Sequence, residues 1–444
     1  QFPQEALAST LAADGKLTAV HITRMATDLA RFHSLASVAK AETAYGGERC
    51  VRDQMGRVIQ QLLPLAREAD DALKLQALWV WIEQEYSRLE EVLAARKRNG
   101  FVRECHGDLH LGNVVLINGL LTPFDGIEFN PALRWVDVMS EVAFPVMDLV
   151  HGRRSDLASL FVDAYLERTG DYEGLSVLRF YLVYRALVRA LARALLARQH
   201  HAPSQDPFRV GSAASYTRLA TRYAHAGRGA IFIMHGLSGC GKSTIATALV
   251  ASLGAVRIRS DVERKRLYGF SALGRTGSAP GSGIYTEAAT RATYGRLHEI
   301  ARSAAQAGFP VIVDAAFLKH SQREDFRRLA EELRLPFAIV SVDAPADILR
   351  ERLRERSRSG SDASEADPPV LQQQIATQEP LSQAESSDAL LIDGARSFAG
   401  SARKAVVETL AARARLDSGG IGGGVIPLRQ PRAPQYNGEI ESAG

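Results

Sequence analysis

The stretch GLSGCGKS, residues 236–243, matches the phosphate-binding pattern GxxxxGK[ST] at every fixed position. A strand pattern precedes it and a helix pattern follows, which disfavours the alternative of a glycine-rich turn without function. Phosphate oxygens in such a loop lie against backbone N–H groups, and glycines permit that close approach. Lys242 would neutralise the β- and γ-phosphates of ATP, and the Ser243 hydroxyl would complete the shell of a Mg²⁺ ion.

We predict that this loop and the residue after it form the cofactor cradle for ATP. Lys242 is also a catalytic candidate, because its charge lies on the transferring phosphate. Cys240 is expected to be a tolerated small residue rather than a nucleophile, since nothing else in the loop requires a thiol. The predicted cradle residues are Gly236, Leu237, Ser238, Gly239, Cys240, Gly241, Lys242, Ser243 and Thr244.

Two acidic residues follow predicted strands of the same region. Asp314 lies near the end of PVIVDAAF, where a carboxylate is expected to anchor Mg²⁺ or its water, and a helix cap is the rival interpretation. Asp261 ends AVRIRSD and could take the proton of an acceptor hydroxyl, with Arg264 and Lys265 holding an anionic group. The alternative there is an N-cap aspartate followed by a solvated basic turn.

Three arginines end a later predicted helix in the stretch RERLRERSRSG, residues 350–360. Arg352, Arg356 and Arg358 could close as a lid over transferring phosphates, since a Gly/Ser-rich loop follows them. They could equally be favourable cations at a helix C-terminus. We name Arg352 and Arg356 as catalytic candidates.

A second, unrelated constellation lies in HGDLHLGN, residues 106–113. Asp108 would be a catalytic base, while Asn113 and Asp125 would hold Mg²⁺ against phosphates, which is the order that phosphoryl transfer in a kinase-type site requires. His106 is expected to brace the loop backbone. Alternatively, His106, Asp108 and His110 could bind a metal as in HxDxH sites, but that reading leaves Asn113 and Asp125 unexplained.

The elements that position these residues differ along the chain. Residues 17–97 show helical periodicity, FVREC and the hairpin NVVLI-NG-LLTPFD indicate short strands, and helices resume at about Trp135. From residue 227 strands alternate with helices, which indicates βαβ units and a parallel sheet. The predicted fold is therefore a multidomain chain, with a mostly α-helical domain at residues 1–226 and an α/β P-loop domain at residues 227–416.

One helix of the first region, VLRFYLVYRALVRALARALLAR, carries regularly spaced arginines. We interpret it as a packed helix with a solvated arginine face, rather than a helix that lies on a membrane or on nucleic acid.

Composition excludes several classes of protein. The 444 residues are 46% hydrophobic and 23% charged, so we expect a soluble chain without membrane spans. Because the net charge is only +4, nucleic acid is an unlikely partner. The three cysteines show no metal or disulfide spacing and indicate a cytoplasmic location. Residues 417–444 are expected to be a disordered tail. Nothing in the sequence indicates an oligomeric state.

The region 227–416 resembles the small P-loop kinases of the nucleoside monophosphate kinase class, and within it the gluconate-kinase-like and zeta-toxin-like group. The resemblance rests on GLSGCGKST, IRSD with its basic pair, VIVDAAF and RLRERSRSG followed by SEA. It implies ATP and Mg²⁺ as cofactors, a phosphoryl acceptor bound near Asp261, and a mobile arginine lid.

The region 1–226 resembles the C-terminal lobe of the aminoglycoside phosphotransferase and choline kinase-like family. HGDLHLGN stands as its catalytic loop and FDGIEFNPALRWVDV as its metal-binding segment. The whole chain resembles bifunctional aminoglycoside phosphotransferase/ATP-binding proteins. On that resemblance Asp108 is the base, Asn113 and Asp125 are Mg²⁺ ligands, and Asp137 is structural.

That family also needs an N-terminal lobe, in which a strand lysine holds the α- and β-phosphates. We find no strand pattern before Phe101, and Lys16 precedes a helix. Since the chain begins with Gln1, we expect that the lobe was cut off or lost and that this domain is incomplete.

We therefore predict that the P-loop domain is an ATP-dependent kinase that phosphorylates a small hydroxylated molecule. Two alternatives stay open. The chain could be a nucleotide-binding regulatory or toxin-like ATPase module, or an aminoglycoside-type phosphotransferase acting through Asp108. A polynucleotide kinase is disfavoured by the weak net charge.

Overall fold

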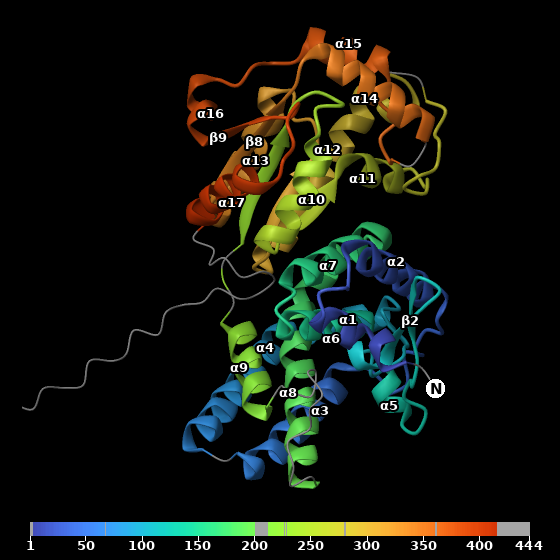
Figure 1. The fold of residues 1–444 in the computed structure, drawn as a ribbon, viewed down its shortest axis with the longest axis vertical. Coiled ribbons are helices and arrows are strands. Elements are labelled where there is room, and N and C mark those ends of the chain that lie inside the picture. The colour runs from blue at the N-terminus through green and yellow to red at the C-terminus, as the bar shows by residue number, and fades with distance from the viewer. Residues whose placement is uncertain are drawn as a thin grey trace, which may run out of the picture.

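The computed structural model describes residues 3–66, 68–199, 212–225, 227, 229–278, 281–359 and 362–414. Figure 1 shows two parts, a helical part that includes the N-terminus and an α/β part built around a sheet. This confirms the predicted fold class. The proposed domain boundary at residues 226 and 227 stays a prediction, and the tail of residues 417–444 lies outside the described residues.

Helices make up most of the first part, because apolar residues recur every three or four positions and give each helix a side that can be buried. Helix α2, for example, buries Ile22, Met25 and Leu29. The helices of this part are α1 (Ala8–Ala13), α2 (Ala19–Leu35), α3 (Glu48–Leu62), α4 (Ala69–Arg98), α5 (Pro131–Arg134), α6 (Val138–His151), α7 (Ser155–Thr169), α8 (Leu175–Gln199) and α9 (Ala213–Ala224).

Short strands hold the loops of the helical part. They are β1 (Val102–Glu104), β2 (Val114–Ile117), β3 (Leu120–Pro123) and β4 (Trp135–Asp137). The predicted hairpin is confirmed, since β2 pairs with β3 and its turn residues Asn118 and Gly119 have φ of 50° and 77°. The predicted helix start at Trp135 is wrong, because β4 pairs with β1 before α6 begins.

Before Phe101 the described residues form helices, turns and two isolated bridges, and no strand, as predicted. Lys16 is exposed and pairs with Asp14 at 2.9 Å. It lies in a turn between α1 and α2 and holds no strand position.

The prediction of a solvated arginine face on α8 is wrong for most of the helix. Arg185 is buried, lies over the ring of Phe144 and donates a hydrogen bond of 3.0 Å to a backbone carbonyl of α6. Arg189 lies 3.9 Å from the carboxylate of Asp148. These arginines are shielded from solvent because α3, α4, α6 and α9 all pack against α8.

No helix in the described part of the chain is long and apolar enough to cross a membrane.

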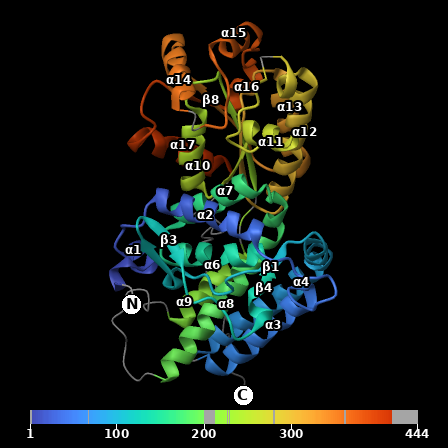
Figure 2. The same ribbon diagram turned by 90° about the vertical axis from the view of Figure 1, so that its right-hand side faces the viewer.

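The second part is a parallel sheet with helices on both faces (Figures 1 and 2). Over the described residues the strand order is β6-β7-β5-β8-β9, and every pair is parallel. The strands are β5 (Ala230–His235), β6 (Val256–Arg259), β7 (Pro310–Asp314), β8 (Phe337–Asp343) and β9 (Ala389–Asp393). All of them match the strands that the sequence pattern predicts, which are AIFIMHG, AVRIRSD, PVIVDAAF, PFAIVSVDA and ALLID.

Four helices of this part match helices that the sequence pattern predicts at residues 242–253, 285–307, 322–335 and 346–358, and four others were not predicted. The matching ones are α10 (Lys242–Leu253), α12 (Glu287–Gln306), α13 (His320–Leu333) and α14 (Ala346–Ser359). The helices without a clear periodic signal are α11 (Ser260–Leu267), α15 (Pro368–Thr377), α16 (Gln383–Asp388) and α17 (Gly400–Ala414).

The side chain of Arg96, near the end of α4, is buried between acidic residues of two other segments. Its Nε donates to Asp137 at 2.7 Å, and its Nη2 donates to Asp171 at 2.9 Å. Asp137 also accepts a hydrogen bond of 2.8 Å from the backbone of Met139 and so caps α6. This cluster ties α4, α6 and the segment before α8 together, which agrees with the structural role expected of Asp137.

Replacing Arg96 with methionine should destabilise the chain strongly, because two carboxylates would stay buried without their partner. We expect a loss of about 3–5 kcal/mol in the free energy of unfolding, measured by urea denaturation of the full chain. Arg88→Met is the matched control, since Arg88 forms an exposed pair with Glu85 and should cost less than about 1 kcal/mol. Equal losses in the two variants would contradict this account of Arg96.

Candidate active site

The phosphate-binding loop connects the buried strand β5 to α10, as the sequence predicts. Its glycines have positive φ, which is 135° at Gly236, 88° at Gly239 and 100° at Gly241. A Cβ at Gly239 would lie 2.9 Å from the backbone oxygen of Leu349, so side chains are excluded there by contact as well as by conformation. Gly241 is the N-cap of α10, and the loop therefore opens onto the N-terminus of that helix.

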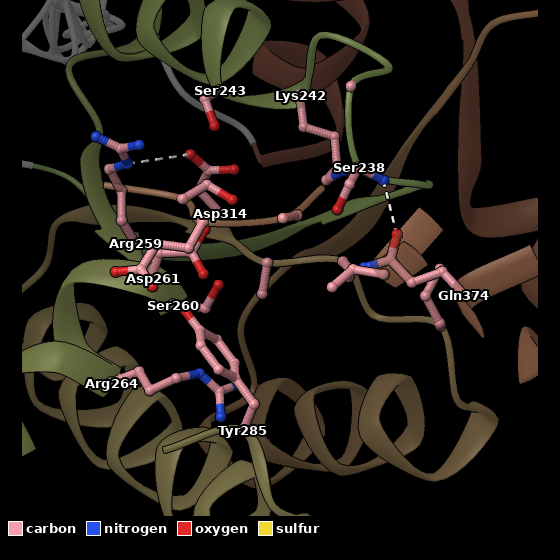
Figure 3. A pocket seen from close by; sticks show the side chains of 18 of the residues that line it. Ser238, Lys242, Ser243, Arg259, Ser260, Asp261, Arg264, Tyr285, Asp314 and Gln374 are labelled. Atoms are coloured by element: carbon pink, nitrogen blue, oxygen red, sulfur yellow. Dashed lines mark hydrogen bonds and ion pairs between the residues drawn. The ribbon is translucent and has the colours of Figure 1, made fainter. Parts of the chain in front are cut away.

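A cavity of about 500 Å³ lies over this loop. The residues that line it come from the loop itself, from the ends of β6 and β7, and from α12, α14 and α15. Figure 3 shows Lys242 and Ser243 after the loop, Asp314 at the end of β7 and Gln374 of α15 around this space. Of the predicted cradle, the lining residues are Ser238, Gly239, Gly241, Lys242, Ser243 and Thr244.

The other predicted cradle residues, Gly236, Leu237 and Cys240, do not line the cavity and instead contact the side chain of Lys242. Lys242 Nζ donates to the carbonyl oxygens of Gly236 and Leu237, both at 2.7 Å. Cys240 is buried with 1% exposure, and its Sγ lies 3.5 Å from Lys242 Nζ. A buried thiol among loop carbonyls agrees with the expectation that Cys240 is not a nucleophile.

Asp314 ends β7 beside the loop, where the sequence predicts a magnesium anchor. Its side chain is buried, and its Oδ2 atom accepts no hydrogen bond in the described structure. The rival role as a helix cap is wrong, because α13 begins several residues later with Lys319 as its N-cap. Figure 3 places Asp314 next to Ser243. A buried carboxylate oxygen without a donor, beside a hydroxyl, fits the oxygen ligands that Mg²⁺ prefers.

Asp261 lies in the first turn of α11 and lines the same cavity. The alternative of an N-cap aspartate is wrong, because Arg259 holds that position. The solvated basic turn is also wrong. Arg264 is 8% exposed and donates to the carbonyl of Ile284 at 2.9 Å, and Lys265 is 1% exposed.

The basic pair after Asp261 therefore has a structural task. Arg264 lies over the ring of Tyr285 and fixes the loop that carries this tyrosine. Lys265 pairs with Glu365 at 3.0 Å. We find Arg264 on the cavity wall, whereas Lys265 lies behind it and does not line that cavity.

Two of the three predicted lid arginines reach the cavity from α14. Arg352 Nη1 donates to the carbonyl of Gly239 at 3.3 Å, and Arg356 Nη2 donates to the carbonyl of Ala366 at 2.9 Å. Both line the cavity, whereas Arg358 is exposed and does not. Their side chains contact the loop and the segment of residues 362–367, which we call the acidic segment.

Sequence reasoning missed several residues of the site. Gln374 of α15 accepts a hydrogen bond of 2.9 Å from the backbone N–H of Ser238, which Figure 3 shows as a dashed line. Arg259 lines the cavity and donates to Asp362 of the acidic segment at 2.7 Å. Tyr285 also lines it. No local pattern marks these side chains, because long-range packing alone brings them to the loop.

The HGDLH loop of the helical part is held by a buried chain of hydrogen bonds. Glu141 accepts from the backbone N–H of Gly107 at 2.8 Å and contacts His33 Nε2 at 2.8 Å, while His33 Nδ1 lies 2.8 Å from the hydroxyl of Tyr165. Burial would raise the pKa of Glu141, but the hydrogen bond and charge of His33 and the Gly107 N–H hold it below its usual value.

Among the described residues, His33, Glu141 and Cys105 form the one group of histidine, cysteine and acidic side chains close enough to share a metal ion. Burial raises the pKa of the Cys105 thiol well above its usual value, which opposes the thiolate that a metal requires. Both ring nitrogens of His33 already have partners. We therefore interpret this group as a brace for the loop.

The fold brings only two of the three predicted site residues of this region, Asp108, Asn113 and Asp125, into contact. Asn113 Nδ2 donates to the Asp108 carboxylate at 3.2 Å, so these two side chains meet. Asp125 is exposed, in a left-handed conformation with φ of 60°, and no described hydrogen bond or ion pair joins it to either of them. The roles of Asp108, Asn113 and Asp125 stay predictions.

The alternative HxDxH metal site is wrong. His106 braces the backbone as expected, with its Nε2 2.8 Å from the carbonyl of Phe124 and its Nδ1 facing the N–H of Asp108. His110 accepts from the N–H of Gly112 and lies 3.5 Å from the Asp108 carboxylate. Because the ring nitrogens of His106 face the loop backbone, the three side chains do not converge on a common point.

Comparison with known proteins finds matches to the α/β part, and we call the matched part the AAA domain after the family model. Residues 231–381 match a family model described as an AAA domain. An adenylyl-sulfate kinase from Myxococcus xanthus is 38% identical over 125 residues, which are 28% of this chain and 63% of that protein. An uncharacterized protein from Mycobacterium tuberculosis is 27% identical over 336 residues, which are 76% of this chain and 66% of that protein. The chain thus spans just under two thirds of that relative's length.

Solved structures similar to the AAA domain include small kinases. A gluconokinase from Sinorhizobium meliloti shares 24% identity over 43% of this chain and 95% of its own, with a TM-score of 0.30. An APS kinase from Mycobacterium tuberculosis in complex with AMPPNP and APS shares 22% identity over 42% of this chain and 99% of its own, with a TM-score of 0.30.

His235, the last residue of β5, gives the AAA domain a pH-dependent stability. Burial, with the positive charges of Arg323 and Lys242, lowers the pKa of His235 from 6.5 to about 4. The unfolded chain therefore binds a proton at a higher pH than the folded chain does. The stability that His235 allows is complete above pH 6.5 and is lost as the pH falls through about 4.

We expect His235→Asn to lessen the loss of melting temperature that accompanies acidification from about pH 7.5 to about pH 5, because the proton uptake on unfolding is removed. His225→Asn is the control, since His225 is exposed. Thermal denaturation of the full chain measures both. A loss of melting temperature in His235→Asn as large as that of the unsubstituted chain would show that this histidine is not responsible.

Proposed function

We propose that the AAA domain transfers the γ-phosphate of ATP to a hydroxyl group of a small molecule bound in the cavity. The observation that carries this proposal is the buried oxygen of Asp314 that accepts no hydrogen bond, in a cavity that also includes Ser243 and Lys242 and extends to Asp261. Hydrolysis alone would not need the second polar wall that Asp261 and Arg264 add to this cavity. The kinase relative from Myxococcus xanthus supports the class of reaction, and the acceptor is not specified by it.

ATP would lie with its phosphates against the loop amides at the N-terminus of α10. Lys242 would exchange its two carbonyl contacts for phosphate oxygens, which gives its charge a stronger partner. Ser243 and Asp314 would hold Mg²⁺, which supplies positive charge to the β- and γ-phosphates when it is bound. Thr244 lines the cavity beside Ser243.

On the acceptor side, the Asp261 carboxylate would take the proton of the attacking hydroxyl. The new bond forms between that oxygen and the γ-phosphorus, the bond from the γ-phosphorus to its bridging oxygen breaks, and ADP leaves. Arg352 and Arg356 enter from α14 and would stabilise charge on the transferring group. A kinase-type mechanism of this kind depends mainly on positioning, so a cavity closed by several elements suits it.

The helical part is a weaker candidate for the chemistry. Asp125 is exposed and not joined to Asp108, and no described element before Phe101 offers a strand lysine for phosphates. We therefore propose that its aminoglycoside phosphotransferase-like site is incomplete in this chain. A cytoplasmic location, which the three free cysteines favour, would supply the ATP that the proposed reaction needs.

Replacing Lys242 with methionine should abolish phosphoryl transfer. Transfer of labelled γ-phosphate would be screened over sugars, nucleosides, adenylyl sulfate and aminoglycosides, and we expect a fall of about 100-fold or more for the accepted substrate. Lys404→Met, on an exposed lysine of α17, is the control for the loss of a charge. Asp108→Asn should leave the activity unchanged. Aminoglycoside labelling that survives Lys242→Met and vanishes in Asp108→Asn would overturn the proposal.

Replacing Asp314 with asparagine should uncouple ATP binding from magnesium. We expect the affinity gained on adding Mg²⁺ to fall by about 10–100-fold, while ATP binding in EDTA changes little, because the side chain keeps its size and loses its charge. Calorimetric titration of the full chain with ATP, with and without Mg²⁺, measures this gain. Asp325→Asn, on an exposed residue of α13, should match the unsubstituted chain. A full magnesium effect in Asp314→Asn would exclude this residue as the anchor.

A further inference from the structure

Two arginines of β6 join the helical part to the candidate active site. Arg257 and Arg259 are two positions apart on the strand, so their side chains share a face. Helix α7 of the helical part packs beside β6, and Figures 1 and 2 both place it at the junction between the parts. Asp163 and Glu167 lie one turn apart on that helix and meet the two arginines.

Glu167 holds both guanidinium groups at once. Its Oε2 atom accepts from Arg257 Nη2 at 2.9 Å, and its Oε1 atom accepts from Arg259 Nη1 at 3.2 Å. Asp163 accepts two further hydrogen bonds from Arg257, at 3.0 Å from the backbone N–H and at 3.1 Å from Nη2. Arg257 thus has two acidic partners on α7, whereas Arg259 has one.

The same arginines border the proposed magnesium anchor. Arg259 and Asp314 are register partners in the sheet, and Arg259 Nε lies 3.9 Å from Asp314 Oδ2. Arg257 Nη1 lies 3.9 Å from the same oxygen. Both distances are too long for hydrogen bonds, and the oxygen has no other donor. Arg259 Nη2 also holds Asp362 of the acidic segment, at 2.7 Å.

We propose that Glu167 is a positioning residue for the active site of the AAA domain, and that it acts through Arg259. By holding the guanidinium group toward α7, Glu167 keeps Asp314 Oδ2 available for Mg²⁺ and keeps Arg259 in line with Asp362. Since it concerns Asp314 as the magnesium anchor, this inference rests on the proposed function. It gives the helical part a task in the reaction without any chemistry in the HGDLH loop.

The two arginines differ in the carboxylates that are available to them. When Glu167 loses its charge, Arg257 keeps its two bonds to Asp163, but Arg259 loses its only partner on α7. The nearest buried carboxylate left to Arg259 is Asp314, across one register position. A guanidinium that donates to Asp314 would occupy the oxygen that the metal needs and would add positive charge beside it. Magnesium binding should weaken, while binding of ATP to the loop should not.

Glu167→Gln in the full chain tests this inference, with Glu173→Gln as the matched control. Glu173 is exposed and lies six positions further along the chain, so its substitution removes the same charge near the same junction. The readout is the ratio of dissociation constants for ATP in EDTA and in Mg²⁺. We expect this ratio to fall at least about fivefold in Glu167→Gln and to be unchanged in Glu173→Gln. A ratio in Glu167→Gln equal to that of the unsubstituted chain would overturn the proposal.

A second pair of variants tests whether the effect passes through Arg259. In an Arg259→Gln background, the substitution Glu167→Gln should change the ratio no further, because the intermediary is gone. A further fall of the full size would refute the route through Arg259. If Glu167→Gln lowers the yield of folded chain, Glu167→Asp keeps the charge on a shorter side chain and should give an intermediate ratio; a ratio equal to that of the unsubstituted chain would count against the proposal.

Comparison with Asp314→Asn distinguishes a failure of the proposed function from a failure of the role proposed for Glu167. If Asp314→Asn abolishes the magnesium effect and Glu167→Gln does not alter it, the proposed function stands and the role of Glu167 is refuted. If Asp314→Asn has no effect, the anchor itself is wrong and the inference fails with it. The expected result is a reduced magnesium effect in both variants, larger for Asp314→Asn.

Discussion

Parallel strand pairing is the constraint on which the candidate site depends. Because β5, β6 and β7 run in one direction, their carboxyl ends meet at one edge of the sheet, and whatever follows each strand is brought to that edge. The phosphate loop follows β5, Asp261 follows β6, and Asp314 ends β7. A loop for phosphates, a base and a metal anchor thus come together although they are spread over many residues of sequence. The helices α14 and α15 then close the cavity from the other side.

The helical part meets this site through the ion pairs between α7 and the arginines of β6. A buried polar network, from Tyr165 through His33 to Glu141, holds the HGDLH loop in place. Its acidic helix α7, in contrast, reaches into the other part and meets the arginines of β6. Under our proposal, a region that resembles a phosphotransferase lobe influences phosphoryl transfer elsewhere in the chain, because the carboxylate that holds Arg259 decides whether this arginine can also donate to Asp314.

Much of this arrangement could be predicted from the sequence where the signal is local. The phosphate loop, the strand before it and α10 all follow from one motif and its flanking periodicity. The hairpin turn at Asn118 and Gly119 follows from the residues that a tight turn requires. Asp314 could be named because a strand pattern ends on it.

What the sequence could not predict depends on contacts between distant segments. Gln374 reaches Ser238 across more than one hundred residues, and Arg259 was visible only as part of a strand. From the sequence, the basic pair Arg264 and Lys265 could either hold an anionic group or be solvated. In the fold it is buried, because a carbonyl and Glu365 satisfy it. The short strand β4 was also missed, since its three residues form a strand only by pairing with β1.

Hydrogen exchange of the full chain with and without ATP and Mg²⁺ tests most directly where the nucleotide acts. Backbone amides that bind phosphate exchange more slowly, so the method reports the site without knowledge of the acceptor. We expect protection of residues 236–247 and of the acidic segment with α15, and no change in residues 104–125. Protection confined to residues 104–125, with the phosphate loop unchanged, would contradict the assignment of the chemistry to the AAA domain.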